Sequence, residues 1–147
     1  MSLTTTIKIA IADDHKIFRD GIKMALSSRE DLKMIWEAED GKDLLHKMVI
    51  KQPDLLLMDI RMPEIDGINA IEMLRKEYED LKIIVLSMYD DQQMISKMME
   101  MGANAYLTKT TDPDEIYEAI VTCMNEDFYF NQLVNKAVMG KLLQKKN

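Results

Sequence analysis

The sequence has few of the residues that cross-link a chain or break its regular structure. A single cysteine, Cys123, excludes an intramolecular disulfide and a cysteine-rich zinc site. Five glycines and three prolines among 147 residues favour regular secondary structure over most of the chain. No apolar run is long enough to cross a bilayer, and no signal peptide opens the chain. We therefore expect a cytoplasmic protein that makes no membrane contact.

Basic charge is also in short supply. The 26 acidic residues outnumber the 19 basic ones, and no acidic residue follows Asp127. Such a chain is a poor partner for nucleic acid and a good one for cations. Hydrophobic residues make up 47% of the sequence, which argues against global disorder. The length predicts one domain with a short extension.

Short apolar runs alternate with segments of helical periodicity. The runs predict five strands, at residues 7–12, 34–38, 55–60, 83–87 and 105–107. Residues 55–58 are continuously apolar, which is typical of strands buried on both faces of a parallel sheet. A helix is expected after each strand, with its apolar stripe facing the sheet. The pattern predicts an α/β fold, a (βα)5 flavodoxin-like, doubly wound, five-stranded parallel sheet.

Several helix ends carry recognisable sequence signals. Asp112 followed by Pro113 and Glu115 predicts an N-cap, a proline in the first turn and a capping glutamate. Asp90 is expected to cap the fourth helix, and Gly102 is expected to close it.

Three segments are expected along the chain. Residues 1–5 form an N-terminal tail, whose first three residues we interpret as an expression-vector scar. Residues 6–126 form the folded domain. Residues 127–147 form a C-terminal linker or one more amphipathic helix, with its apolar residues at Leu133, Val134, Ala137, Val138 and Leu142.

Reactive side chains follow four of the five predicted strands. Asp13 and Asp14 follow the first strand, Asp59 lies near the end of the third, Ser87 ends the fourth, and Lys109 follows the fifth. Ligands of open α/β sheets bind at the carboxyl ends of the strands, so these groups should converge. Three converging carboxylates require a neutralising cation, and an all-oxygen site suits Mg²⁺.

A carboxylate beside Mg²⁺ can act as a nucleophile toward phosphorus. Asp59 could therefore accept a phosphoryl group and become an aspartyl phosphate. Lys109 would neutralise one phosphoryl oxygen and Ser87 would hydrogen-bond another. Little more is required, since phosphoryl transfer depends mainly on positioning and charge.

At this point the chain resembles the receiver domain of two-component response regulators, over roughly residues 6–126. The motifs that carry the resemblance are Ile11-Ala12-Asp13-Asp14-His15, Met58-Asp59-Ile60-Arg61-Met62-Pro63-Glu64-Ile65-Asp66-Gly67, Val85-Leu86-Ser87-Met88 and Gly102-Ala103-Asn104-Ala105-Tyr106-Leu107-Thr108-Lys109. The resemblance implies that a sensor histidine kinase phosphorylates Asp59.

The resemblance also implies roles for the other site residues. The ligands it implies for Mg²⁺ are Asp13, Asp14, Asp59 and the backbone carbonyl of Arg61. It makes Lys109 the phosphoryl clamp, and Ser87 and Tyr106 the switch pair, in which Tyr106 turns inward as Ser87 moves. For Tyr106 an ordinary packing role in the fifth strand is the alternative.

The segments Asp14-His15 and Phe18-Arg19-Asp20-Gly21, with the tail from Phe128, resemble regulators of the LuxR/NarL type. Such regulators usually carry a C-terminal helix-turn-helix domain, which these 147 residues do not include. We expect the regulatory part of a LuxR-type transcriptional regulator, which binds DNA only through that missing domain and forms a homodimer on phosphorylation. The alternative is a stand-alone receiver that acts in phosphotransfer or protein binding.

Three residues beside the expected site need separate comment, and two of them depart from the family pattern. Thr110 stands where many receivers have proline, and Met88 is bulkier than the residue common after the switch hydroxyl. His15 is expected to cap or pack at the first helix and not to take part in the chemistry.

Other chemistries on a similar sheet are disfavoured. A phosphatase of the haloacid-dehalogenase type needs a second aspartate two residues after its nucleophile, where this chain has Arg61. A flavodoxin needs a hydroxyl-rich phosphate loop after the first strand, where Asp13 and Asp14 would repel the phosphate. No G-x-G-x-x-G motif is present for a dinucleotide. The chain is therefore not expected to be an enzyme beyond its own phosphorylation and dephosphorylation.

Overall fold

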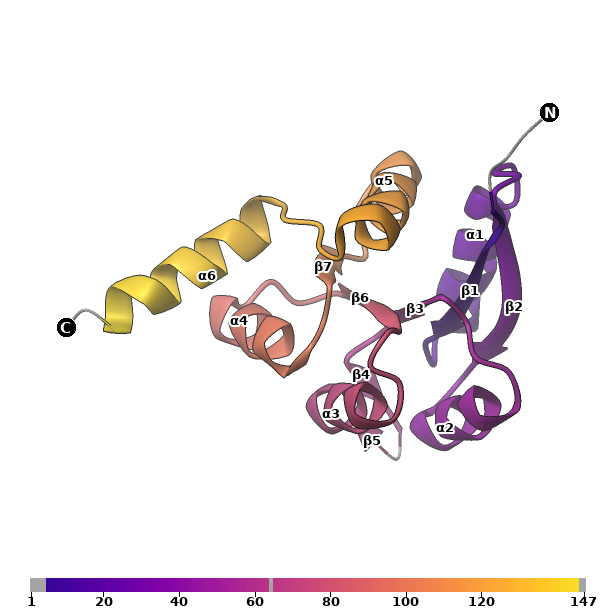
Figure 1. Ribbon diagram of the computed structural model, residues 1–147, viewed down its shortest axis with the longest axis horizontal. Coiled ribbons are helices and arrows are strands. Elements are labelled where there is room, and N and C mark those ends of the chain that lie inside the picture. The colour runs from indigo at the N-terminus through magenta and orange to yellow at the C-terminus, as the bar shows by residue number, and fades with distance from the viewer. Residues whose placement is uncertain (1–4, 64, 146–147) are drawn as a thin grey trace.

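The computed structural model describes residues 5–63 and 65–145, and for residues 65, 66, 144 and 145 it describes only the backbone. The expected vector scar and most of the N-terminal tail lie outside these residues. Five parallel strands form the central sheet in the order β2-β1-β3-β6-β7 (Figure 1). Their bounds are β1 (Ile7–Ala12), β2 (Leu32–Ala38), β3 (Leu55–Met58), β6 (Lys82–Ser87) and β7 (Ala105–Thr108). The predicted sheet is confirmed, with strand ends that shift by one or two residues.

Helices cover both faces of this sheet, as a doubly wound fold requires (Figure 1). On one face lie α1 (Lys16–Leu26) and α5 (Pro113–Glu126). On the other lie α2 (Gly41–Ile50), α3 (Gly67–Glu77) and α4 (Gln92–Met101). No described helix has the length and apolarity that crossing a membrane requires.

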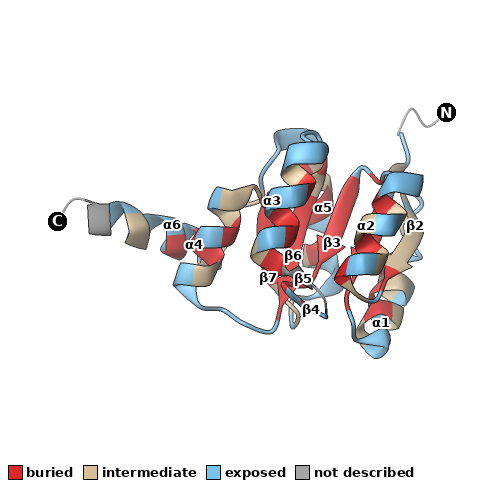
Figure 2. Ribbon diagram, turned by 90° about the horizontal axis from the view of Figure 1, so that it is seen from below, coloured by how far each residue is buried: buried red, intermediate tan, exposed pale blue. Residues whose placement is uncertain are grey.

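The core consists of two apolar layers, one on each side of the sheet. Alternate residues of β3 point to opposite layers, so that Leu56 and Met58 pack toward α2 and α3 while Leu55 and Leu57 pack toward α1 and α5. Figure 2 shows the central strands β3 and β6 as buried, whereas β2 at the edge of the sheet is mostly half-buried and the outer faces of the helices are exposed. All four residues of β3 are fully buried, which explains their continuous apolar sequence.

Two helix boundaries follow the predicted signals and one does not. The Asp112 carboxylate accepts a hydrogen bond from the Asp114 N–H, and Gly102 ends α4 with a φ of 124°. The prediction that Asp90 caps α4 is wrong, because the neighbouring Asp91 accepts hydrogen bonds from the N–H groups of Gln93 and Met94. Adjacent aspartates offer the same capping carboxylate, and the phase of the helix decides between them.

The loop after β3 contains a small element that the sequence patterns missed. Two-residue strands, β4 (Arg61–Met62) and β5 (Ile65–Asp66), pair antiparallel before α3 begins. Gly67 follows them and packs directly on the backbone of Ile60, where a Cβ atom on Gly67 would lie 2.6 Å from the Ile60 Cα. The loop therefore returns against the residue that follows Asp59.

The predicted extra helix is present as α6 (Gln132–Lys145), which runs from the fifth helix toward α4 (Figure 1). Val134 and Ala137 are buried and join the core layer that contains α4. Lys141 forms an ion pair with Glu100 on α4. The predicted apolar face is only half covered, because Val138 and Leu142 are exposed.

Candidate functional site

The polar strand ends converge at one edge of the sheet. The Asp13 N–H donates a hydrogen bond of 2.9 Å to the carbonyl of Ala38, and the Asp59 N–H donates one of 2.9 Å to the carbonyl of Ala12. These backbone bonds continue the sheet ladder past the last residues of β1 and β3. The ladder therefore holds both aspartates in register, with Asp13 1% exposed and Asp59 5% exposed.

Four potential ligand side chains gather at this edge. One ligand atom from each of Asp13, Asp14, His15 and Asp59 lies within 4.8 Å of the other three. The three carboxylates of this group are those that follow the first and third predicted strands. His15 occupies the N-cap position of α1, at the start of the first helix as expected, but its side chain makes no capping hydrogen bond.

The imidazole of His15 instead faces the acidic residues. Its Nδ1 lies 3.2 Å from Oδ1 of Asp13 and 3.2 Å from Oδ1 of Asp14. The same nitrogen lies 3.4 Å from Nζ of Lys109. The position of His15 directly after Asp14 is the only feature of the sequence that indicates these contacts. A residue at that position is more simply interpreted as a helix cap.

Lys109 lies among these acidic groups. Its Nζ lies 2.8 Å from Oδ2 of Asp59 and 2.7 Å from Oδ2 of Asp13. Burial favours the neutral amine, but the contacts with Asp13 and Asp59 outweigh it and raise the pKa of Lys109. The ammonium therefore stays charged, and it already contacts the carboxylate that the sequence predicts as the nucleophile.

The donor set suits a hard divalent cation. Oδ2 of Asp13 is buried and accepts no hydrogen bond, although the Lys109 ammonium lies close to it. The ammonium offsets part of the cost of burying this oxygen, which can still coordinate a second positive group. Carboxylate oxygens are the ligands that Mg²⁺ prefers, so these residues fit that ion.

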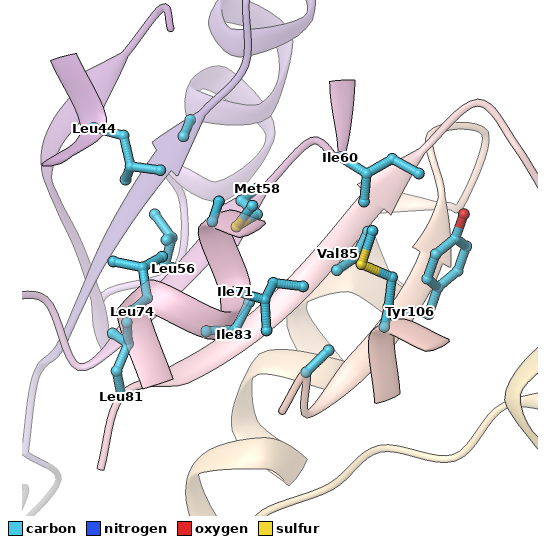
Figure 3. Packing of buried hydrophobic residues seen from close by; sticks show 14 of the residues in the cluster. Leu44, Leu56, Met58, Ile60, Ile71, Leu74, Leu81, Ile83, Val85 and Tyr106 are labelled. Carbon is cyan, nitrogen blue, oxygen red and sulfur yellow. The ribbon is translucent and has the colours of Figure 1, made fainter. Parts of the chain in front are cut away.

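The two residues predicted as a switch pair are both buried and share one neighbour. Ser87 Oγ accepts a hydrogen bond of 3.0 Å from the Tyr89 N–H, and the Tyr106 hydroxyl donates one of 2.7 Å to the Tyr89 carbonyl. Figure 3 shows the Tyr106 ring beside Val85, with its hydroxyl at the edge of the apolar layer. The Tyr89 backbone therefore links the side chains of Ser87 and Tyr106.

A cationic side chain and an aromatic ring flank the site. The Arg61 N–H donates a hydrogen bond of 3.1 Å to Oδ1 of Asp59, and the Arg61 guanidinium lies 4.1 Å from the centre of the Tyr89 ring. Met88, the bulkier residue after Ser87, is 67% exposed. Thr110 follows Lys109 where many receivers have proline. The peptide bond between them is trans, as are all the others among the described residues.

Sequence reasoning missed the role of Arg19. This arginine is 7% exposed, and its guanidinium donates a hydrogen bond of 2.6 Å to the backbone carbonyl of Asp13. Its Nε donates another of 2.8 Å to the Glu37 carboxylate on β2. Arg19 therefore links the turn that carries Asp13 to the neighbouring strand. The segment around Arg19 contributed to the family resemblance, but nothing in its pattern indicated this contact.

Comparison with known proteins agrees with the geometry. Residues 9–121 match the family model of the response regulator receiver domain. The transcriptional regulatory protein DegU of Brevibacillus brevis is 37% identical over 114 residues, which cover 78% of this chain and 48% of that protein. The response regulator protein VraR of Staphylococcus saprophyticus is 32% identical over 139 residues, which cover 95% of this chain and 66% of that protein.

A solved structure extends the comparison to the fold. A LuxR-family two-component response regulator from Aurantimonas sp. SI85-9A1 superposes with a TM-score of 0.86 at 25% identity, and the match covers 95% of this chain and 99% of that one. The chain spans about half to two thirds of the two curated relatives described above. The predicted family and its LuxR/NarL character are confirmed, and this chain belongs to the response regulator receiver domain family.

Proposed function

We propose that the protein is a phosphorylation-controlled signalling receiver in which Asp59 accepts a phosphoryl group from the phosphohistidine of a sensor histidine kinase. The observation that carries this proposal is the contact between Asp59 and the buried ammonium of Lys109, 2.8 Å away, beside Asp13. A carboxylate held among acids and next to a fixed cation is suited to receive a further anionic group.

The proposed transfer uses the groups at the strand ends. An Asp59 carboxylate oxygen forms a bond to phosphorus while the phosphorus–nitrogen bond to the donor imidazole breaks, and the imidazole leaves with the bonding electrons. Lys109 then holds a phosphoryl oxygen as the clamp. Mg²⁺, held by Asp13, Asp14, Asp59 and the Arg61 carbonyl, would neutralise the phosphoryl charge and draw electron density from phosphorus.

The proposed switch uses the bonds around Tyr89. An aspartyl phosphate adds charge and strong acceptor oxygens next to Ser87. If Ser87 donates to a phosphoryl oxygen, its hydroxyl moves away from the Tyr89 N–H that it binds at 3.0 Å. The Tyr89 backbone and the Tyr106 hydroxyl bound to it then shift together, which changes the surface formed by α4, β7 and α5.

The larger protein is proposed to be a LuxR-type transcriptional regulator. Residues 6–126 are its receiver domain, and residues 127–147 contain the extra helix and a linker. DNA binding would belong to a helix-turn-helix domain outside these 147 residues, and phosphorylation would favour a homodimer in the cytoplasm. The names of the relatives as transcriptional regulators support this role more than that of a stand-alone receiver. Beyond its own phosphorylation and dephosphorylation the domain is not proposed to catalyse a reaction.

Intact-mass spectrometry after incubation with acetyl phosphate tests the proposal. We expect one phosphoryl adduct that requires Mg²⁺ and disappears in Asp59→Asn. A matched control is Asp90→Asn, which removes an exposed carboxylate from the loop before α4 and should keep the adduct. Absence of an adduct in the wild-type protein, or an unchanged adduct in Asp59→Asn, would refute the proposed chemistry.

A further inference from the structure

The ring of Phe18 covers the Lys109 ammonium. Lys109 Nζ lies 4.7 Å from the centre of the Phe18 ring, although the two residues are 91 positions apart in the sequence. Phe18 belongs to the first turn of α1, and Lys109 follows β7. A cation within about 6 Å of a phenyl face is attracted by the negative potential of the ring. The contact therefore joins the start of α1 to the end of the last strand.

The surroundings of Lys109 show what the ring contributes. Two of the nearby groups are the carboxylates of Asp13 and Asp59, and a third is the imidazole nitrogen of His15 at 3.4 Å. The Lys109 side chain is only 5% exposed. Phe18 is the apolar partner among these groups. Its ring attracts the ammonium, but it does not take the place of the carboxylate oxygens to which the ammonium donates its N–H groups.

We propose that Phe18 is a positioning residue for Lys109, which holds the ammonium through a cation–π contact so that it can pass from the Asp59 carboxylate to a phosphoryl oxygen. This inference rests on the proposed function. When Asp59 becomes an acyl phosphate, the negative charge of its carboxylate is replaced by that of the phosphoryl oxygens, so Lys109 exchanges one anionic partner for another. The ring keeps its attraction for the ammonium throughout, because its quadrupole does not depend on the charge of Asp59.

A purely structural role is the competing explanation. Phe18 also packs against the apolar layer formed by α1, α5 and the sheet, so its removal could disturb α1 itself. A packing role and a cation–π role respond differently to a change in the electrons of the ring that leaves its shape nearly unchanged. Packing depends on the volume of the side chain, whereas the cation–π contact depends on the electron density of the ring.

The test compares the rate of phosphorylation by acetyl phosphate in Mg²⁺ among variants of residue 18. Phe18→Leu should slow the reaction roughly 3- to 10-fold, which is the size expected for a partly desolvated cation–π contact. Phe18→Tyr and Phe18→Trp should keep the wild-type rate, because both retain a ring. Phenylalanine analogues with one, two and three ring fluorines should slow the reaction progressively, since fluorine withdraws electron density from the ring face.

Controls separate this inference from general damage and from the proposed function. Ile17→Leu changes the neighbouring residue of the same turn, which is 89% exposed, and should leave the rate unchanged. A Phe18→Leu rate within about two-fold of wild type, or a flat fluorination series, would overturn the inference. If the wild-type protein accepts no phosphoryl group, the proposed function itself has failed. Wild-type uptake with a flat series would refute only the role of Phe18.

Discussion

The Tyr106 hydroxyl donates a hydrogen bond of 2.7 Å to the carbonyl oxygen of Tyr89, whose N–H is bound to Ser87. Burial raises the pKa of the Tyr106 phenol, so this hydroxyl remains a proton donor over the whole working range of pH. The loop between β6 and α4 is thereby tied at one residue to both members of the proposed switch pair.

Removal of the Tyr106 hydroxyl should loosen this loop. Tyr106→Phe leaves the Tyr89 carbonyl without its partner, and we expect a loss of about 1 kcal/mol in the free energy of unfolding. Amide exchange of residues 88–91 should become faster. Tyr129→Phe is the matched control, because it removes a hydroxyl bound to Glu115 at a distance from this loop. Unchanged exchange of residues 88–91 in Tyr106→Phe would contradict the proposed coupling.

Gly67 should be far less tolerant of a side chain than Gly21. A Cβ atom at Gly67 would lie 2.6 Å from the Ile60 Cα, whereas one at Gly21 would have no neighbour within 4 Å. We expect Gly67→Ala to lower the free energy of unfolding by about 2 kcal/mol or more, because backbone must move. Gly21→Ala, in the middle of α1, should raise it by about 0.5–1 kcal/mol.

The consequence at the site distinguishes the two glycines further. Ile60 follows Asp59, so a displaced Ile60 backbone moves the proposed phosphoacceptor. Gly67→Ala should therefore also slow phosphorylation by acetyl phosphate, and Gly21→Ala should not. Equal stability of the two variants in urea denaturation would show that the loop accommodates the methyl group.

Cys123 should be chemically silent in the folded protein. It is completely buried on α5, and burial raises the pKa of its thiol to about 12. Because the unfolded thiol ionises near pH 8.5, the free energy of unfolding should fall as the pH rises from about 8.5 toward 12. Reaction with a disulfide reagent at pH 8 should follow global unfolding. Rapid labelling in the absence of denaturant would show that α5 opens locally.

The sheet and its strand ends could be predicted from the sequence for a physical reason. A strand buried on both faces must be apolar along its length, and the polar residues that follow such strands necessarily lie at one edge. Asp13, Asp59 and Lys109 converge as expected, and the Lys109 N–H donates a hydrogen bond to the Ser87 carbonyl. The capping residue of α4 was misplaced by one position, since the phase of a helix depends on how it packs.

Contacts between side chains from distant segments could not be predicted in this way. Arg75 on α3 donates hydrogen bonds to the carbonyls of Leu81 and Gly102, and to the Asn104 side chain. These partners lie up to 29 residues away. No local pattern distinguishes this arginine from an exposed one, and the same holds for Arg19. The small hairpin of β4 and β5 could not be predicted either, because strands of two residues are too short to show a periodic pattern.

Glu37 should account for part of the protein's sensitivity to acid. Its carboxylate accepts hydrogen bonds from Lys23 and from Arg19. Both bonds lower the pKa of Glu37, and the bond from Lys23 has the larger effect. A carboxylate with a lowered folded-state pKa stabilises the fold above its unfolded pKa, which is near 4.3. That contribution is lost as the pH falls through the folded-state value, where Glu37 takes up a proton.

Glu37→Gln should therefore reduce the free energy of unfolding at pH 7, by about 1–3 kcal/mol, because it also leaves the buried Arg19 without its carboxylate. The difference from wild type should shrink as the pH is lowered from about 5 to 3, since the wild-type carboxylate is then protonated too. Urea denaturation at several pH values measures this difference. Glu39→Gln, an exposed neighbour, should show no such trend. A difference that stays constant with pH would mean that the packing of residue 37, and not its charge, stabilises the turn that carries Asp13.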